Sequence, residues 1–427
     1  MHFAFIKDLS EKDERLVVGL DIGTSKICAV VAEVPVRERT DMRGGPVSLN
    51  VLGIGTASSR GIRKGAITNI ENMSESIREA VREAEHSAGV EIRAVHIGIG
   101  DGNIGCLPSH GVIAVKEKEI GQDEVDNVID AARAVALPFD REMLHVIPSG
   151  FTVNGQNGIT DPRGMGGVRL ETSVHIVTCA TTSLQNLIRS CQRADLEVID
   201  VMFQPLASSQ AMLTPDEKEL GIAVVDIGGG TTDIALFHEG SVCHASVITV
   251  GGNNFTNDIA VGLRIPSHEA EKLKKRHGCV MLSMMRDNEE MDVSHAAGAG
   301  RRTIPRSYLI EILQPRAEEL FTLIKKEITE TGLHHTLNAG VVLTGGAVLM
   351  EGMDIMAENV LDLPVRTGRA EGIEGPAGIT DNPSYTTAIG LALHGGEDEI
   401  ADTGPGSGRL LTGIRSRMTG LLKLFGH

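Results

Sequence analysis

The chain contains the same short pattern twice, and this repetition restricts the fold more than any other feature of the sequence. An apolar run at residues 16–20 leads into DIGTSK, and a second run at 222–225 leads into DIGGGTTD. Each run has the composition of a buried strand, and each is followed by a Gly-rich turn and another apolar strand, at 27–33 and at 234–237. Two equivalent strand–turn–strand units predict two structurally related halves.

The rest of the chain alternates between expected strands and helices. Strands are expected at 47–56, 198–202 and 340–343, and apolar residues at helical spacing predict helices at 70–87, 182–193 and 306–331. This alternation predicts an α/β fold. Two stretches have the character of insertions: 89–170, with strands and a helix of its own, and 265–332. The polar loop at 283–302 within the second stretch is expected to be disordered.

The two Gly-rich turns carry the residue types that hold phosphate. Glycines let backbone N–H groups approach phosphate oxygens, hydroxyls donate further hydrogen bonds, and a lysine adds positive charge. Asp21 and Asp226, each at a strand end, would face one another across a cleft and hold a hydrated Mg²⁺. The other candidates are Gly23, Thr24, Ser25, Lys26, Gly228, Gly229, Gly230, Thr231 and Thr232. One copy alone would equally suit a structural hairpin, but two copies and a third turn, LTGGAVLM at 343–350, favour a nucleotide site.

The last residues, 409–427, form a basic amphipathic pattern. Apolar residues recur at helical spacing, every charged side chain is basic, and a Gly-rich acidic stretch at 395–408 precedes the segment as a flexible linker. This composition predicts a helix that lies on an anionic membrane surface, although a terminal helix packed on the protein's own core would show the same stripe. The candidate membrane-binding residues are Leu410, Leu411, Ile414, Arg415, Arg417, Met418, Leu421, Leu422, Lys423 and Phe425.

Composition excludes several other classes of protein. A net charge of −17, the absence of Trp and the presence of only two Tyr argue against a nucleic-acid-binding protein. The six cysteines are scattered without a CxxC pair, which indicates free thiols in a reducing compartment. There is no signal-peptide pattern and no apolar run of about eighteen residues, so we expect a cytoplasmic protein with peripheral membrane contact.

The motifs resemble those of a known superfamily. GLDIGTSK, VVDIGGGTTD and LTGGAVLM are similar to the two phosphate motifs and the adenosine motif of the actin-like ATPases, and QPLASS at 204–209 resembles their first connecting helix. Within that superfamily the chain resembles the FtsA family of bacterial cell-division proteins, above all in AEKLKKRHGC at 270–279 and in the terminal GLLKLFGH.

This resemblance implies an actin-like two-lobed ATPase fold of the α/β class, with an inserted α+β subdomain in the first half and a C-terminal amphipathic helix. The implied first lobe comprises 1–88, 171–213 and 380–394, and the inserted subdomain comprises 89–170. The second lobe comprises 214–264 and 333–379, with its own insertion at 265–332. The linker at 395–408 and the membrane helix at 409–427 follow.

The resemblance also implies ATP and Mg as cofactors and gives roles to further residues. Glu271, Lys274 and Lys275 would line ribose and adenine, and the nucleoside would pack on Gly345, Gly346, Ala347 and Met350. Gln204 stands where relatives carry a residue that orients the attacking water, although a lone Gln equally suits a polar helix cap. The chain would then be at most a slow ATPase.

The partners implied by the resemblance are those of a membrane tether. The body would bind the C-terminal tail of the tubulin-like polymer protein FtsZ through the second insertion, with Arg301, Arg302 and Arg306 supplying charge. An isolated arginine group is equally typical of solvated surface. The chain would also form actin-like filaments with itself, contact other division proteins and anionic lipids, and act at the cytoplasmic face of the plasma membrane at the division site.

Three other classes share this fold. A sugar or acetate kinase needs a catalytic Asp near the first connecting helix, where only Gln204 is found. A chaperone ATPase of the DnaK type needs a large substrate-binding domain after the third turn, for which the chain is too short. A pilus-assembly relative of the PilM type shares the insertion but attaches through a membrane partner, so the basic terminal segment favours the tether.

Overall fold

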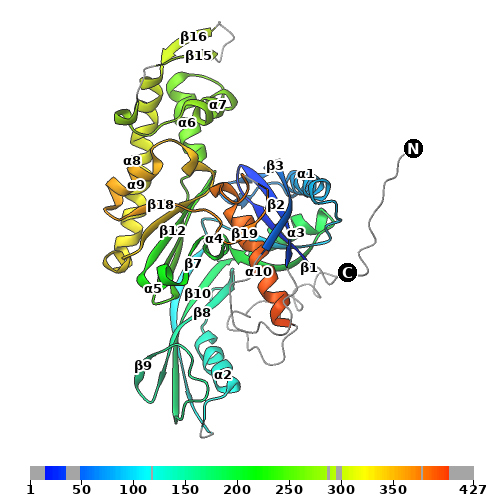
Figure 1. Ribbon diagram of the computed structural model, residues 1–427, viewed down its shortest axis with the longest axis vertical. Coiled ribbons are helices and arrows are strands. Elements are labelled where there is room, and N and C mark those ends of the chain that lie inside the picture. The colour runs from blue at the N-terminus through cyan, green and yellow to red at the C-terminus, as the bar shows by residue number, and fades with distance from the viewer. Residues whose placement is uncertain are drawn as a thin grey trace, which may run out of the picture.

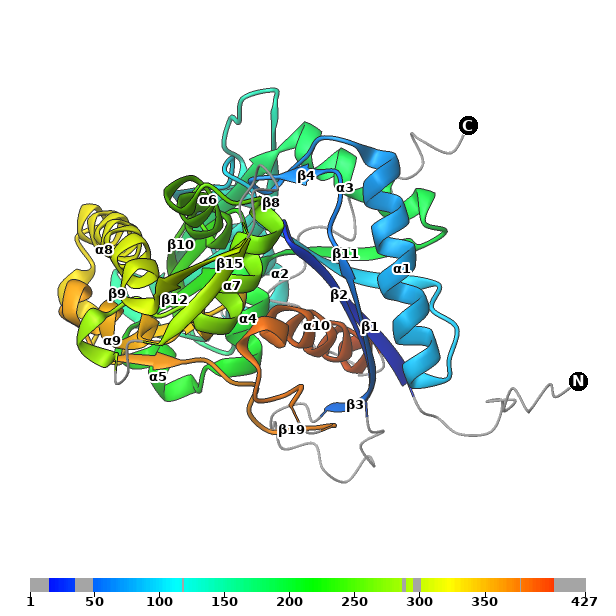
Figure 2. The same cartoon turned by 90° about the horizontal axis from the view of Figure 1, so that it is seen from above.

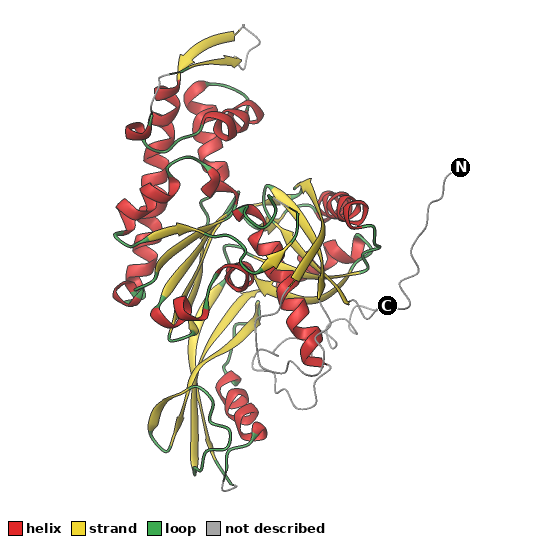
Figure 3. Cartoon of the chain, viewed as in Figure 1, coloured by secondary structure: helices red, strands yellow, loops and turns green. Residues whose placement is uncertain are grey.

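A computed structural model of the chain describes residues 15–34, 49–116, 119–285, 289–294, 301–376 and 378–402. It shows two lobes side by side, a smaller subdomain that extends beyond them at one end, and a helical arm with a β-hairpin at the other (Figure 1). The same elements coloured by type show that each lobe is a sheet covered by helices (Figure 3). The two-lobed α/β architecture expected from the motifs is therefore present.

The first lobe is built on a six-stranded sheet with the strand order β11-β6-β1-β2-β3-β19. The strands are β1 (Arg15–Ile22), β2 (Lys26–Val34), β3 (Leu49–Ser58), β6 (Ala94–Ile99), β11 (Glu197–Phe203) and β19 (Ile373–Glu374). Helices α1 (Ile70–Ala88) and α3 (Thr181–Arg193) cover one face, and α10 (Thr386–Asp402) lies on the other (Figure 2). The short pair β4 (Ile62–Arg63) and β5 (Ala66–Ile67) precedes α1.

Helix α1 illustrates how local sequence defines an element. The side chain of Asn69 caps the first turn by accepting from the N–H of Asn72, and Gly89 ends the helix in the left-handed conformation at φ 72°. Met73, Ile77 and the other apolar residues at this spacing are buried against β2 and β3.

The second lobe repeats the arrangement with a five-stranded sheet of order β14-β13-β12-β17-β18. Its strands are β12 (Ile222–Ile227), β13 (Thr232–His238), β14 (Ser241–Ile248), β17 (Gly340–Thr344) and β18 (Val365–Thr367). One face is covered by α6 (Gly252–Leu263), α8 (Arg306–Glu330) and α9 (Met353–Leu361), with α7 (Ser267–His277) packed on α6. In each lobe an antiparallel hairpin, β1–β2 or β12–β13, is joined by one parallel neighbour, β6 or β17, which confirms the predicted internal repeat.

Helix α4 (Gln204–Met212) lies between the two lobes. It contacts β11 and α10 of the first lobe and β12 and β13 of the second. Nearly all of its residues are buried, as its position between two sheets requires. The short helix α5 (Pro215–Leu220) then leads into β12. Helix α4 therefore connects the two lobes in the sequence and contacts both of them in space.

The inserted subdomain is a four-stranded antiparallel sheet of order β7-β10-β8-β9 with one helix. Its elements are β7 (Gly105–Ala114), α2 (Gln122–Arg133), β8 (Arg141–Val153), β9 (Gln156–Ile159) and β10 (Arg169–Ala180). The sheet contacts β14 of the second lobe, while β8 contacts β11 and β10 contacts α3 of the first. The subdomain therefore touches both lobes.

Two expectations from the sequence were wrong. The stretch 283–302, expected to be disordered, contains the antiparallel hairpin β15 (Glu290–Ser294) and β16 (Arg301–Pro305). Its alternating apolar residues Met291, Val293 and Ile304 are buried in the core of the second lobe, which compensates for the polar composition. The linker expected from 395 is helical as far as Asp402, where α10 ends.

The glycine at 395 shows why composition was misleading at the linker. A Cβ on Gly395 would lie 2.6 Å from Nε2 of His96. Glycine is therefore required at 395 because α10 packs closely on β6. It is not there to make the chain flexible. The predicted amphipathic segment 409–427 lies outside the described residues.

Two further features bear on the class of protein. All six cysteines are free, and Cys28, Cys179, Cys191 and Cys279 are buried. In the described ranges, no helix combines the length and apolar character needed to cross a membrane.

Candidate functional site

The two Gly-rich turns have the same closing hydrogen bond. The N–H of Gly23 donates to the carbonyl of Lys26 at 3.1 Å, and the N–H of Gly228 donates to the carbonyl of Thr231 at 2.9 Å. In each case the turn joins two antiparallel strands directly after the motif's first Asp. The sequence repeat is thus also a repeat of backbone geometry.

The second turn is held from behind by the start of α6. The N–H groups of Gly252 and Asn253 donate to the carbonyls of Gly228 and Gly229, at 2.9 and 2.7 Å. These contacts turn the carbonyls toward α6. Within the described part of the chain no group accepts from the amide N–H of Gly229 or of Gly230, so both donors remain available to a ligand.

The two turns face each other across the gap between the lobes. A Cβ placed on Gly229 would lie 2.0 Å from the Oγ of Ser25, and one on Gly230 would lie 2.7 Å from the Oγ1 of Thr24. Thr24 in turn accepts a hydrogen bond from the N–H of Gly65 at 3.1 Å. The structure therefore brings the predicted residues of both motifs together in one place.

Three carboxylates lie at the base of this gap. Burial, with the charge of Asp226, raises the pKa of Asp21 to about 7. Burial raises the pKa of Asp226 to about 6, despite a hydrogen bond of 3.0 Å from Thr387. Burial, with the charge of Asp226, also raises the pKa of Asp233 well above its usual range. A group of acids that repel one another in a buried site is typical of a place where a cation binds.

Asp233 is a site residue that the sequence reasoning missed. It is the last residue of DIGGGTTD and pairs directly opposite Asp226 in the β12–β13 hairpin. It is 2% exposed, and its Oδ1 has no hydrogen-bond partner among the described residues. Since the turn between two paired strands fixes their register, this second acid could have been placed beside the first from the motif alone.

Gln204 lies against the first of these acids. It is the first residue of α4, is 8% exposed, and donates from Nε2 to the Oδ1 of Asp21 at 2.8 Å. A Cβ on Gly100 would meet the Oε1 of Gln204 at 2.2 Å and the carboxylate of Asp233 at 3.0 Å. Gln204 is thus placed among the acids. It does not act as a side-chain cap, because the first turn of α4 has no such hydrogen bond.

Lys26 does not point at the turns in this structure. Its Nζ donates to the carbonyl and to the Oγ of Ser384, at 2.9 and 3.2 Å, and lies 4.0 Å from the centre of the Tyr385 ring. Burial lowers the pKa of Lys26. Ser384 and Tyr385 belong to a single helical turn at Pro383–Tyr385 that the sequence reasoning did not assign to the site.

The third Gly-rich turn lies beside the second. Gly345 has φ 90°, and a Cβ there would lie 2.4 Å from the Oδ1 of Asp226. Only glycine allows this approach without strain. Ala347 lies 3.5 Å from the position of a Cβ on Gly252, and Met350 packs near Gly278 at the end of α7. The turn therefore borders the gap from the side of the second lobe, as expected for a nucleoside wall.

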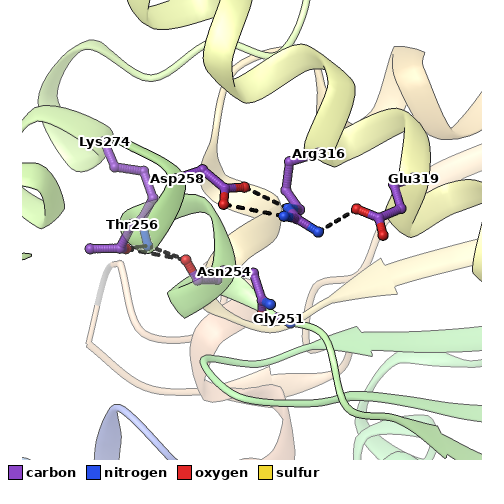
Figure 4. A network of polar contacts seen from close by, with 8 residues as sticks. Gly251, Asn254, Thr256, Asp258, Lys274, Arg316 and Glu319 are labelled. Carbon is purple, nitrogen blue, oxygen red and sulfur yellow. Dashed lines mark hydrogen bonds and ion pairs between the residues drawn. The ribbon is translucent and has the colours of Figure 1, made fainter. Parts of the chain in front are cut away.

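The predicted pair on α7 is present and is tied to α6. Lys274 lies 2.7 Å from Glu271 and donates to the carbonyl of Gly252 and the Oγ1 of Thr256, both at 2.8 Å. Figure 4 shows Lys274 with Thr256, beside the pair of Asp258 on α6 with Arg316 on α8, which ties α6 to α8. Lys275 lies 3.4 Å from Glu271 and is mostly exposed. Since Lys274 contacts Gly252, these residues reach the back of the second phosphate turn.

The gap between the turns holds a small cavity of about 110 Å³. It is lined by residues of all three motifs together with Gln204, Asp233, Gly65, Gly100, Pro383, Ser384 and Thr387. Sites for ligands of the size of a nucleotide commonly measure about 300 Å³ or more. The cavity thus corresponds to the space between the turns and the acids, and the walls around Ala347, Met350 and α7 lie outside its lining.

The three arginines expected to bind a partner have different environments. Arg306 lies 2.7 Å from Glu351 and donates to the carbonyl of His277, with 18% of its side chain exposed. Arg302 is exposed, and its guanidinium contacts the carbonyl of Leu263. Arg301 belongs to β16, but its side chain lies outside what is described. Arg306 thus has an internal ionic partner, which the sequence did not reveal.

Comparisons with known proteins agree on the class. Solved structures of similar fold include a PilM–PilN type IV pilus biogenesis complex, with a TM-score of 0.63 and 15% identity over 89% of this chain and 98% of that one. They also include MreB5 of Spiroplasma citri bound to ADP, with a TM-score of 0.52 and 13% identity over 91% and 97%. A MamK double helical filament matches with a TM-score of 0.51 and 14% identity over 92% and 100%. Two lobes of this kind, with equivalent turns facing across a gap, define a protein of the actin-like fold class.

Sequence comparison identifies the family within that class. The family model described as cell division protein FtsA matches residues 223–390, and the model of the SHS2 domain inserted in FtsA matches 102–178. Cell division protein FtsA of Pseudomonas aeruginosa is 42% identical over 90% of each chain, and that of Escherichia coli K12 is 37% identical over 91% and 92%. The chain belongs to the FtsA family of cell-division proteins.

Proposed function

We propose that this FtsA-family chain binds ATP with Mg²⁺ between its lobes and tethers FtsZ filaments to the cytoplasmic face of the plasma membrane. Nucleotide binding is inferred from the pair of equivalent turns, which face each other above buried acids. Membrane binding is inferred from the terminal amphipathic segment, residues 409–427. The domain boundaries expected from the sequence belong to the same proposal.

The phosphates would lie between the two turns. The amides of Gly229 and Gly230, which have no acceptor among the described residues, would donate to the phosphates, and the hydroxyls of Thr24 and Ser25 lie close to these glycines from the other lobe. Lys26 would contribute charge once a phosphate competes for its Nζ with the carbonyl of Ser384. The walls formed by Gly345–Met350 and α7 would hold the nucleoside.

The acids fit a hydrated magnesium ion. Asp21, Asp226 and Asp233 would hold such an ion by accepting hydrogen bonds from its water ligands. The unpartnered Oδ1 of Asp233 is an acceptor of the required kind. When bound, the ion would neutralise charge on the phosphate oxygens.

Hydrolysis by this site would be slow. Gln204 lies beside Asp21, where its amide can orient a water, but an amide cannot remove a proton from it. Nucleotide occupancy would then mainly control assembly of the chain into actin-like filaments. Turnover of tens per second, as in kinases, would contradict this assignment.

The nucleotide assignment is tested by titration of the protein with a fluorescent ATP analogue, with and without Mg²⁺. We expect tight binding that weakens when the metal is chelated. D226N should remove most of the metal dependence while retaining the fold. Binding of equal strength in the presence and absence of Mg²⁺ would exclude the proposed metal role.

The tether is tested by sedimentation with anionic vesicles. The full chain should carry FtsZ into the vesicle pellet, and a chain that lacks 409–427 should not. Attachment would be reversible for one chain and firm for a filament, because polymerisation multiplies the anchors. Docking of the FtsZ tail is assigned to the arm that carries β15, β16 and α8, with Arg301, Arg302 and Arg306. Pelleting of FtsZ with the truncated chain would refute the tether.

A further inference from the structure

A histidine of the inserted subdomain contacts the backbone next to the proposed catalytic glutamine. The N–H of Phe203, the last residue of β11, donates to the Nε2 of His145 on β8 at 3.0 Å. A backbone N–H can only donate, so Nε2 must carry the lone pair and the ring proton must lie on Nδ1. The next residue, Gln204, begins α4 and donates to Asp21.

The surroundings of His145 preserve this arrangement. Burial of the ring is the main reason why the pKa of His145 is lowered to about 4; the charge of Asp200 on β11 opposes this shift, and His394 on α10 adds to it. Asp200 lies 2.9 Å from the Nε2 of His394. The strand β11 has an irregularity between Val198 and Asp200 in its pairing with β6. His145 is therefore neutral near pH 7 and stays an acceptor for Phe203.

The same strand is also attached to the second lobe. Three residues beyond His145, the carbonyl of Pro148 accepts from the Oγ of Ser241 on β14 at 3.2 Å. His145, Pro148 and Ser241 all line a cleft of about 610 Å³ between the subdomain, α4 and the second lobe. Strand β8 therefore contacts β11 of the first lobe and β14 of the second.

From this geometry we infer that His145 is a positioning residue, which fixes Phe203 and thereby Gln204, and so couples the seating of the inserted subdomain to the nucleotide site. The effect on hydrolysis rests on the proposed function, because it assumes that Gln204 acts on the bound nucleotide. The structural link from His145 to Phe203 does not. A protein that displaces the subdomain would alter hydrolysis without touching the nucleotide. By linkage, nucleotide binding would alter the affinity of the subdomain for that protein.

The test uses variants of the full chain. H145F keeps a ring of similar size but removes the acceptor, and H145Q supplies an amide oxygen as acceptor. H175F is the matched control, because His175 is a partly buried histidine on β10 of the same subdomain. Should H145F fail to fold, H145N replaces it, since its shorter side chain withdraws the acceptor from Phe203 but remains polar.

The first measurement is hydrogen–deuterium exchange over 197–212, which needs no nucleotide. Exchange at the Phe203 amide should be about ten-fold faster in H145F, should recover in H145Q and should be unchanged in H175F. Equal exchange in H145F and the parent chain would overturn the proposal, whatever the nucleotide site does.

The second measurement is single-turnover hydrolysis with saturating ATP. H145F should slow it by up to about 100-fold while nucleotide affinity stays within about two-fold, because misplacement acts on chemistry more than on binding. H145F combined with Q204A should be no slower than Q204A alone. If Q204A is slow and H145F is not, His145 is not a positioning residue. If Q204A itself hydrolyses ATP like the parent chain, the proposed role of Gln204 fails, and exchange alone decides on the structural link.

Discussion

The glycines of the second phosphate turn should differ sharply in their tolerance of a methyl group. A Cβ on Gly230 would lie 2.7 Å from the Oγ1, 2.8 Å from the Cγ2 and 3.0 Å from the Cβ of Thr24 in the other lobe. A Cβ on Gly228 would lie 3.3 Å from the carbonyl oxygen of Thr231 within its own turn. G230A therefore obstructs closure of the gap, whereas G228A does not.

The magnitude follows from the packing. Thr24 is branched at Cβ, so no single rotation removes both of its γ atoms from the new methyl group. Overpacking of this kind costs about 1–3 kcal/mol, which corresponds to about 5- to 150-fold weaker binding if closure is needed to hold the nucleotide.

Titration of a fluorescent ATP analogue with Mg²⁺ measures this effect. We expect G230A to bind at least about five-fold more weakly than the parent chain, and G228A to remain close to it. Parent-like affinity in G230A would show that the turns do not close on the ligand. An equal loss in both variants would show that the whole turn, and not the facing methyl group, is responsible.

Three further predictions concern the acids, the terminal segment and the arm. Because the folded pKa values of Asp21 and Asp226, about 7 and about 6, lie above the ordinary 3.8, their protonated forms stabilise the nucleotide-free fold. This stabilising contribution is complete below about pH 4 and is lost as the pH rises through 6 and 7. The unfolding temperature measured by calorimetry should therefore fall between pH 5 and 8, while the affinity for Mg²⁺·ATP rises. An affinity independent of pH would contradict this prediction. L421E combined with F425E should release the chain from anionic vesicles and leave ATP binding intact, because each apolar side chain buried in the bilayer contributes about 1.5 kcal/mol or more to membrane binding. Undiminished co-sedimentation would refute the membrane helix. The double variant R302E/R306E should weaken FtsZ-tail binding and reduce its salt dependence in a pull-down. The control is R306E/E351R, which restores the internal ion pair and so separates loss of docking charge from loss of stability. Unchanged binding would move the docking site elsewhere.

Much of the proposed nucleotide site was predictable from local sequence. A tight turn after a buried strand requires glycine, and an Asp at the strand end must lie beside that turn, so DIGTSK and DIGGGTTD identify two hairpins without tertiary information. Their repetition identifies two related lobes. Helix α1 was placed correctly for a similar reason, because its cap residues and its apolar spacing are properties of the segment itself.

Properties that depend on distant segments were not predictable. The contact of Gln204 with Asp21 joins residues 183 positions apart, and its geometry depends on α4 being held between two sheets. The orientation of Lys26 toward Ser384 depends on a turn 358 residues later. The sequence reasoning treated Gly228 and Gly229 alike, but the position of Ser25 in the other lobe distinguishes them.

The sequence alone therefore determined the two turns, the internal repeat and the chemical character of the site, because backbone conformation in a short motif follows from its own residues. Only the tertiary structure decided that residues 290–294 and 301–305 pair as strands, that Gly395 allows a helix to pack on His96, and that Arg306 is paired with Glu351. It also decided that Asp233 is buried with a free acceptor atom. Burial, charge pairing and close packing are set by which remote elements meet, and no local pattern contains that information.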